Sequence, residues 1–243
     1  MAVRGRRASP SLYAEARVIG VVVAGAAGRM GETTCDAVSR ASDLELVAGV
    51  DPARGTKLQD ALASAPGAVD VVVDFTQPDA VLGNVAVCLE AGVHSVIGTT
   101  GFDIDELERL VSEGSANVFV APNFAIGAVL MMRFATEAAP RMAKAEIIEL
   151  HHDTKLDAPS GTAKRTAELM ARATGGPAPP IHSVRLPGIV ANQDVILGET
   201  GETLTIRHET TSREAFMSGV LLAVRKVGEL PRRLTVGLEA LLF

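Results

Sequence analysis

Short apolar runs alternate with helical segments over residues 17–123, and this alternation limits the fold more than any other feature of the chain. Runs such as "RVIGVVVAG" and "VDVVVDF" are almost wholly apolar, which is typical of strands buried on both faces of a parallel sheet. Strands are predicted at 17–25, 44–51, 69–75, 94–101 and 117–123, and helices at about 30–42, 78–89 and 103–114. The alternation predicts right-handed βαβ units and a Rossmann-like, doubly wound parallel sheet of the α/β class.

The pattern changes after Asn123. A long helix is predicted at about 127–143, a strand at 145–152, a helix from residue 160, and short strands at 182–188, 191–198 and 202–210. This order is typical of a mixed α+β unit with a mostly antiparallel sheet. A final helix near 213–227 is expected to return to the first unit. The chain is therefore divided into 17–124 with 213–243, and 125–212.

The composition excludes several classes of function. The net charge of -6, the absence of Trp and the lack of a basic stripe argue against nucleic-acid binding. No apolar run reaches the roughly 18 to 20 residues that a membrane-spanning helix needs. Cys35 and Cys88 match no metal-ligand spacing, so they are predicted to be reduced thiols of a soluble, cytoplasmic protein.

Residues 1–16 differ in character from the rest of the chain. They contain three arginines before the first acid and no apolar core, so they do not form a secretory signal. An organelle transit peptide of this length would be very short. A disordered tail, or a start codon assigned too early, is the preferred interpretation.

A glycine-rich turn follows the first predicted strand. Gly25, Gly28 and Gly31 are spaced G-x-x-G-x-x-G. Such glycines allow a tight turn, a close approach of backbone N–H groups to a pyrophosphate, and tight packing of the helix on the sheet. The helix N-terminus adds partial positive charge. An ordinary strand-to-helix turn is the alternative, but the context favours dinucleotide binding, because Asp51 closes the second strand where a ribose needs an acceptor.

The residue type at position 51 bears on the choice of cofactor. A carboxylate accepts hydrogen bonds from the ribose hydroxyls of NADH and repels the 2′-phosphate of NADPH. Pro52 follows and offers no donor, although Arg29 or Arg54 is available to a phosphate. The sequence therefore predicts NADH as the cofactor, with NADPH also accepted.

Small and hydroxyl residues gather at the ends of the later strands. Phe75 and Thr76, residues 98–102 and residues 121–125 all follow predicted strands. Ligands of doubly wound sheets bind beyond these carboxyl ends. Ordinary turn chemistry explains each segment singly, but together they predict a cofactor channel, with Asn123 available to the nicotinamide carboxamide.

The segment "ELHHDTKLDAPSGTAKR", residues 149–165, holds two of the five histidines. Successive strand residues face opposite sides, so His151 and His152 need not share a role. A cleft histidine is a good general acid, and the alternative for either residue is a hydrogen-bonded brace. The helix start at 160–162 offers N–H donors to a carboxylate, and Lys155 adds a positive charge. No cluster with metal-ligand spacing accompanies the pair, so no metal is expected. The remaining histidines, His94, His182 and His208, are predicted to be ordinary strand residues.

Six blocks of the chain, in order, resemble the 4-hydroxy-tetrahydrodipicolinate reductase (dihydrodipicolinate reductase) family of lysine biosynthesis. They are "VVVAGAAGRMGE", "VVVDFTQPDAV", "VIGTTGF", "APNFAIG", "ELHHDTKLDAPSGTAKRTAEL" and "GETLTIRHETTSREAFMSGVLLAV". The fifth block is far more specific than the glycine turn. The resemblance implies NAD(P)H-dependent reduction of 4-hydroxy-tetrahydrodipicolinate to tetrahydrodipicolinate, with loss of water, in the diaminopimelate route.

The resemblance also implies residue roles. His151 corresponds to the proton donor and acceptor of the family, and Lys155 to a proton donor. Substrate contacts correspond to His152, Gly161 and Thr162, to which the helix-start argument adds Ser160. Cofactor contacts correspond to Gly25, Ala26, Ala27, Gly28, Arg29, Met30, Asp51, Gly98, Thr99, Thr100, Ala121, Pro122, Asn123 and Phe124. The family is typically a homotetramer joined through its substrate domain, so residues 125–212 are expected to bind substrate and to form a tetramer.

Two positions depart from the family pattern. A histidine often stands in the loop at the position of Asn192, and a basic residue often stands at the position of Pro52. Two other functions are alternatives. A different two-domain NAD(P)-dependent amino-acid or semialdehyde dehydrogenase leaves the "HHDTKLDAPSGT" block unexplained. A non-catalytic dinucleotide sensor needs no acid in its cleft.

Overall fold

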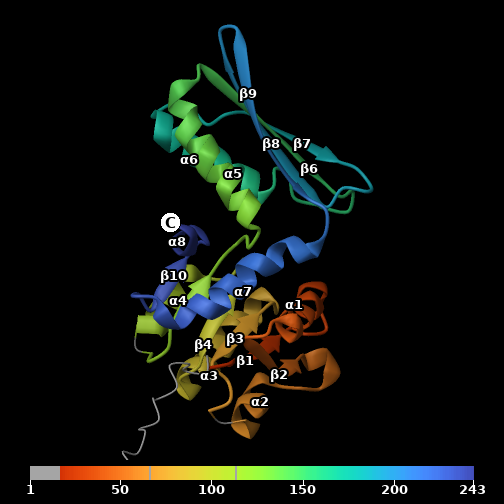
Figure 1. Cartoon of the computed structure of the whole chain (residues 1–243), viewed down its shortest axis with the longest axis vertical. Coiled ribbons are helices and arrows are strands. Elements are labelled where there is room, and N and C mark those ends of the chain that lie inside the picture. Colours follow the sequence, from red (N-terminus) through yellow and green to blue (C-terminus); the bar gives the residue numbers. More distant parts are fainter. Residues whose placement is uncertain (1–16, 66, 113) are drawn as a thin grey trace, which may run out of the picture.

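The structure is a computed structural model that describes residues 17–65, 67–112 and 114–243. It contains two sheets, each with its own helices (Figure 1). The predicted tail at residues 1–16 lies outside the described residues. Within the described ranges, no helix is long and apolar enough to cross a bilayer.

The first sheet has six strands in the order β10-β5-β4-β3-β1-β2. The strands are β1 (Ile19–Ala24), β2 (Leu44–Val50), β3 (Val71–Asp74), β4 (His94–Ile97), β5 (Val118–Val120) and β10 (Leu234–Val236). All the pairings are parallel. The strand order reverses between β1 and β3, and the crevice beyond the carboxyl ends at such a point is where doubly wound sheets bind ligands. The predicted Rossmann-like class is confirmed.

Helices cover both faces of this sheet. They are α1 (Arg29–Arg40), α2 (Leu58–Ser64), α3 (Pro78–Ala91), α4 (Ile104–Ser112), α7 (Met217–Lys226) and the short α8 (Glu239–Leu242). Val21 and Val23 of β1 face the core with α1 and α7, whereas Val22 faces the core with α2 and α3. The strand is apolar throughout because both of its faces are buried.

The second sheet has four strands in the order β7-β6-β8-β9. They are β6 (Lys144–His151), β7 (Ile181–Arg185), β8 (Ala191–Glu199) and β9 (Glu202–Thr210). The β6–β7 pair is parallel and the other pairs are antiparallel, which confirms the mostly antiparallel prediction. Helices α5 (Ile126–Ala138) and α6 (Gly161–Thr174) pack on the face that carries Ile147, Val195 and Leu197.

The element boundaries differ from the prediction in a few places. Helix α5 ends at Ala138 rather than near residue 143, because Pro140 supports only the 3₁₀ turn Ala139–Arg141 that comes next. The short elements α2, β10 and α8 were not predicted. Strand β10 pairs with β5, so the chain after residue 213 returns to the six-stranded sheet.

Candidate active site

The turn after β1 has the shape that its glycines permit. Gly25 has a φ of +80°, and a Cβ added there would lie 2.6 Å from the carbonyl oxygen of Phe75. A Cβ at Gly31 would lie 2.1 Å from the carbonyl oxygen of Gly25. Gly28 is the N-cap of α1 and places no capping side chain over the first turn. The turn is therefore a backbone cradle at a helix N-terminus, which suits a pyrophosphate.

Asp51 links the end of β2 to this cradle. Its Oδ2 accepts a hydrogen bond from the N–H of Ala27 at 3.0 Å, and its Oδ1 accepts one from the N–H of Ala53 at 2.8 Å. A cavity of about 510 Å³ opens beside it, and Gly25, Gly28, Asp51, Thr56, Lys57, Phe75 and Thr76 are among its lining residues. Arg54 pairs with Glu32 at 3.2 Å. A cradle with an adjacent carboxylate fits the diphosphate and ribose of a dinucleotide.

The other predicted cofactor residues lie at the ends of the neighbouring strands. Thr99 donates its hydroxyl to the carbonyl oxygen of Thr76 at 2.8 Å, which ties the ends of β4 and β3 together. A Cβ at Gly98 would lie 2.1 Å from the ring of Phe75. Phe124 is buried and packs edge-on against Phe75. Ala26 and Ala121 are also buried, while Arg29 lines a different cavity with Arg213.

A second pocket, of about 200 Å³, lies between the two sheets. Its lining residues are Pro122, Asn123, Ala128, Met131, His151, Ser160, Thr162, Ala191, Asn192, Gln193, His208, Thr210 and Phe216. The Nδ2 of Asn123, just past β5, donates to the Oγ1 of Thr162 in α6 at 3.2 Å. The pocket therefore joins the end of the dinucleotide-type sheet to the start of the α6 helix.

The two adjacent histidines have different surroundings. His151 ends β6 and lines the pocket, and its Nδ1 contacts a carboxylate oxygen of Glu149. Burial lowers the pKa of His151 below its usual range, with Lys155 and Arg185 acting in the same direction and Glu149 opposing them. His152 lies past the strand, and its Nδ1 contacts the Oγ1 of Thr154 at 2.7 Å. Of the two, His151 is the one that lines the pocket.

The start of α6 completes the segment. Ser160 is buried, and its hydroxyl accepts from the N–H of Ala163 at 3.2 Å, as expected of an N-cap. A Cβ added at Gly161 would meet nothing within 4 Å. The Nζ of Lys155 donates to both carboxylate oxygens of Asp157, at 2.7 and 2.9 Å, and this hydrogen bonding lowers the pKa of Asp157.

Several residues in or beside the pocket were not singled out from the sequence. His208 lies in strand β9, as predicted, but it also lines the pocket, which the sequence did not indicate. Burial lowers the pKa of its imidazole. Asn192 lies in β8, within the strand predicted at 191–198, and its Oδ1 accepts from the N–H of Thr210 at 3.1 Å. Glu149 and Arg185, which lie next to His151, were also missed. Only Glu149 had a local signal, since it shares a strand face with His151.

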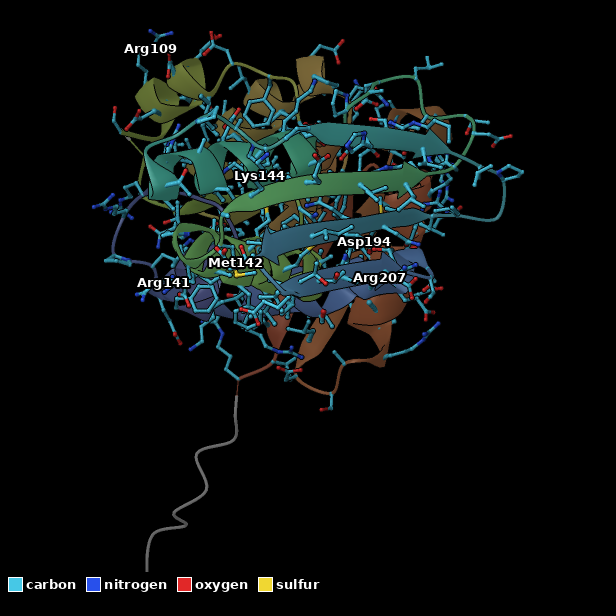
Figure 2. The ribbon with its side chains drawn as sticks, turned by 90° about the horizontal axis from the view of Figure 1, so that it is seen from above. Arg109, Arg141, Met142, Lys144, Asp194 and Arg207 are labelled. Carbon is cyan, nitrogen blue, oxygen red and sulfur yellow. The ribbon has the colours of Figure 1, made fainter. Side chains whose placement is uncertain are left out.

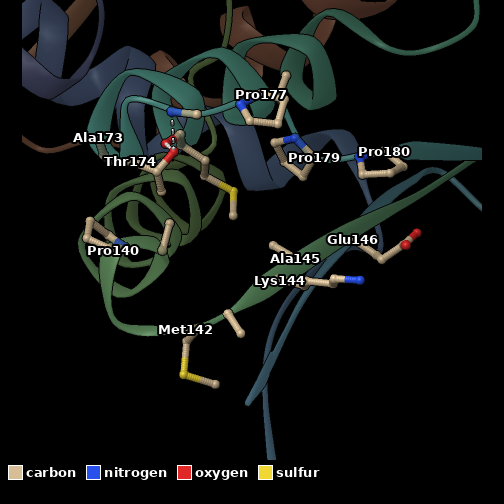
Figure 3. A pocket seen from close by; sticks show the side chains of 15 residues that line it. Pro140, Met142, Lys144, Ala145, Glu146, Ala173, Thr174, Pro177, Pro179 and Pro180 are labelled. Atoms are coloured by element: carbon tan, nitrogen blue, oxygen red, sulfur yellow. Dashed lines mark hydrogen bonds between the residues drawn. The ribbon is translucent and has the colours of Figure 1, made fainter. Parts of the chain in front are cut away.

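Other features of the described residues lie outside this site. No group of three or more His, Cys, Asp or Glu side chains in these ranges is placed to hold a metal ion. Both cysteines are free, and burial raises the pKa of Cys88 to about 11. A cavity of about 590 Å³ at the far end of the four-stranded sheet is lined by residues such as Pro140, Glu146 and Pro180, and by none of the predicted site residues (Figure 3).

Comparison with family models gives a match to each part of the chain. A model described as the N-terminus of dihydrodipicolinate reductase matches residues 19–124. A second model, described as the C-terminus of dihydrodipicolinate reductase, matches residues 127–242. The two matches together span nearly all of the described residues.

Individual proteins agree with the family models. The chain is 50% identical to the 4-hydroxy-tetrahydrodipicolinate reductase of Thermobifida fusca, over 93% of this chain and 99% of that protein. It is 48% identical to the enzyme of the same name from Mycobacterium marinum, over 91% and 98%.

Solved structures include close and distant neighbours. The dipicolinate-bound dihydrodipicolinate reductase of Paenisporosarcina sp. TG-14 aligns with a TM-score of 0.80 and 35% identity, over 92% of this chain and 99% of that one. A myo-inositol 2-dehydrogenase from Lactobacillus plantarum aligns at 0.61 with 10% identity, over 87% and 89%. At this identity the second match shows the fold alone.

Proposed function

The chain belongs to the dihydrodipicolinate reductase family, and on this premise we propose the reaction and the roles of its residues. The reaction is the reduction of 4-hydroxy-tetrahydrodipicolinate to tetrahydrodipicolinate, with loss of water, by a reduced pyridine nucleotide. It belongs to the diaminopimelate route of lysine biosynthesis and takes place in the cytoplasm. The observation that carries the proposal is the pocket in which His151 and Thr162 meet Asn123 at the edge of the dinucleotide-type sheet.

The substrate carries two carboxylates, which need fixed donors. The first turn of α6 supplies backbone N–H groups at Gly161 and Thr162, and a helix N-terminus favours negative charge. The Nζ of Lys155 donates to Asp157. When a substrate carboxylate replaces Asp157 as its partner, Lys155 adds a mobile positive charge to the substrate site. His152 makes a further contact from the strand end. These donors hold the substrate over the pocket.

Proton transfer falls to two side chains. When bound, the reduced nicotinamide supplies a hydride to a substrate carbon. Negative charge that develops in the substrate is neutralised by a proton from His151, whose imidazole lines the pocket. Lys155 is the second proton donor.

The cofactor is proposed to be NADH, with NADPH also accepted. The backbone cradle of residues 25–30 binds the diphosphate, and Asp51 accepts from the ribose hydroxyls. Asp51 repels a 2′-phosphate, but Lys57 lines the same cavity and offsets part of that repulsion. The residues at the ends of β4 and β5 (Gly98, Thr99, Thr100, Ala121, Pro122, Asn123 and Phe124) face the nicotinamide end.

A coupled assay tests the function. The product of the dihydrodipicolinate synthase reaction is the substrate, and the loss of reduced-nicotinamide absorbance is followed with NADH and with NADPH. A higher kcat/KM for NADH than for NADPH is expected. Absence of turnover by folded protein with either cofactor removes the proposal, and a strong preference for NADPH overturns the cofactor assignment alone.

The uncovered face of the four-stranded sheet is proposed to join four copies of the chain. Helices α5 and α6 cover the opposite face. The uncovered face carries half-buried Ile148, Leu150 and Ile196 beside the charged pair Asp194 and Arg207 (Figure 2). A self-complementary apolar patch with paired charges is typical of homo-oligomer interfaces. Sedimentation analysis is expected to give a tetramer, and a monomer at micromolar concentration contradicts this assignment.

A further inference from the structure

A fully buried carboxylate lies directly behind the proton donor of this site. The side chain of Glu149 is 0% exposed. His151 follows it by two residues in β6, so both side chains lie on the same face of the strand. An ionised carboxylate buried in this way is costly unless it is paired and hydrogen-bonded. Glu149 belongs neither to the proposed substrate contacts nor to the proposed cofactor contacts, so its burial needs another explanation.

Arg185 holds this carboxylate from the neighbouring strand β7. Its Nη2 donates to the Oε1 of Glu149 at 2.8 Å, and its Nη1 donates to the Oε2 at 3.0 Å. Such bidentate pairs fix orientation as well as charge. Burial by itself raises the pKa of Glu149, but hydrogen bonds from Arg185, Ser183 and His151 outweigh burial and bring the pKa down to about 2. Glu149 is therefore ionised throughout the neutral range.

The ionised carboxylate decides which nitrogen of His151 faces the pocket. Oε2 of Glu149 contacts Nδ1 of the imidazole, and a carboxylate only accepts hydrogen bonds. Nδ1 therefore carries a proton in both the neutral and the charged imidazole, and Nε2 is the atom that gains and loses the catalytic proton. Carboxylates set the tautomer and the orientation of functional histidines in the same way elsewhere.

The same carboxylate reaches the helix start that is proposed to bind the substrate. Its Oε1 accepts from the backbone N–H of Ser160, the N-cap of α6, at 3.3 Å. Arg185 extends the connection, because its Nη2 also donates to the carbonyl oxygen of Asp157 at 2.8 Å. The Glu149–Arg185 pair thus ties the end of β6, the loop before α6 and the N-cap of α6 into a single frame.

We propose that Glu149, clamped by Arg185, is the positioning residue for proton transfer: it directs Nε2 of His151 into the pocket and fixes the imidazole relative to the substrate-binding start of α6. The inference rests on the proposed function and deepens it. Glu149 does not itself touch the substrate.

The charges around His151 give the expected pH dependence. Burial is the main cause of the lowered pKa of the imidazole, and Glu149 is the group that opposes it. The ionisable groups that act on the imidazole are Glu149 of β6, Arg185 of β7 and Lys155 of the loop. Lys155 is paired with Asp157, and His208 of β9 lines the same pocket. Removal of the negative charge at position 149 leaves the positive neighbours unopposed, so the pKa of His151 falls further. Since the acid form is needed, the decline of kcat with rising pH then begins at lower pH.

The test is the substitution Glu149→Gln, which keeps the shape of the side chain and removes its charge. We expect kcat to fall by about 10- to 100-fold with little change in KM, as for loss of an interaction used in the transition state. The alkaline limb of the kcat profile is expected to move down by about one pH unit. Nitrogen NMR of the His151 ring is expected to show Nδ1 protonated in the wild type and a mixture of tautomers in the variant. A wild-type kcat and pH profile in the variant, or an unchanged tautomer, overturns the proposal.

The chain offers a matched control on the same strand. Glu146 of β6 contacts His182 of β7, but this Glu–His pair is exposed and lies away from the pocket. Glu146→Gln is expected to leave kcat, KM and the pH profile unchanged. An equal loss in this control shows that the activity responds to any change in the sheet, and the positioning role is then rejected.

A second variant covers failure to fold, because Glu149→Gln leaves the charge of Arg185 without its partner. The double variant Glu149→Gln, Arg185→Gln removes both charges together. Its binding of NADH, measured by fluorescence titration, shows whether the half with the six-stranded sheet is folded. The double variant is expected to bind NADH normally and to show the same tautomer mixture. An inactive wild-type protein contradicts the proposed function. The positioning role is tested separately, because nitrogen NMR reports the tautomer of His151 in the wild type whether or not the protein is active.

Discussion

The two halves of the proposed site are built by different physical means. Around the turn after β1, the proposed cofactor site is built from the backbone: Gly25 and Gly31 leave no room for a side chain, and both oxygens of Asp51 accept from main-chain N–H groups. Around the end of β6, the proposed proton-transfer group is held by side chains: Glu149, Arg185 and His151 form one connected group.

The difference teaches where each half is sensitive. A backbone cradle fails when a side chain is added, because the added atoms meet main-chain atoms that have nowhere to move. A side-chain network fails when a group is removed, because the buried partners are left unsatisfied. Substitutions that add a side chain in the turn after β1, and substitutions that remove a side chain near the end of β6, therefore test this contrast.

The largest effect is expected from His151→Ala. Loss of the proposed general acid is expected to lower kcat by about 10²- to 10⁴-fold with only a modest change in KM. Steady-state kinetics with saturating NADH measures both constants. His182→Ala, on the exposed part of β7, is the control and is expected to keep wild-type rates. Near-normal kcat in the His151 variant means that water or another group donates the proton.

The next effect is expected from Gly25→Ala. A φ of +80° costs an alanine about 1 to 2 kcal/mol, and the contact at 2.6 Å with the backbone of Phe75 adds to this cost. Stability is expected to fall by about 3 kcal/mol, and NADH binding is expected to be lost. Thermal unfolding and fluorescence titration measure the two changes.

Gly175 provides the matched control for that substitution. It has a φ of +68° after α6, and an added Cβ there meets nothing within 4 Å. Gly175→Ala is expected to cost about 1 kcal/mol, from the backbone conformation alone. Equal losses in the two variants contradict the role assigned to the close approach of Gly25 and Phe75.

Lys155→Ala is expected to have an intermediate effect. A hydrogen bond to a charged group contributes about 1.5 to 3 kcal/mol, so kcat/KM is expected to fall by about 10- to 100-fold. Both kcat and KM change, since Lys155 is assigned to substrate binding and to proton donation. Lys144→Ala, an exposed lysine at the start of β6, serves as the control. An unchanged KM for the substrate removes the carboxylate-binding assignment.

The smallest effect is expected from Gly161→Ala. The added Cβ meets open space, and alanine is favourable in a helix, so the unfolding temperature is expected to stay the same or rise slightly. If the substrate approaches this turn, the added methyl group crowds it only mildly, so KM for the substrate is expected to rise by no more than about 3-fold. A fall in stability like that of Gly25→Ala contradicts the contrast between the two halves.

The dinucleotide half was largely predictable because its signals are local. The apolar runs predict buried parallel strands, the glycine spacing predicts the cradle, and Asp51 follows at the expected distance. Short elements such as β10 were missed, since three residues carry too little periodicity to be recognised. The end of α5 was predicted too late, because the helical periodicity continues beyond Pro140. Pro140 lacks the N–H that a continuing helix needs, so the helix ends before it.

The sequence by itself determined the fold class, the glycine cradle and the segment that holds the histidines, because each depends on residues close together in the chain. Only the tertiary structure decided the surroundings of His151. Arg185 lies 36 positions beyond Glu149 and meets it only because β6 and β7 pair in parallel, with His151 opposite Arg185. His208 and Asn123 reach the same pocket from β9 and from the other sheet. Contacts between distant segments depend on strand order and register, and local residue patterns do not encode these.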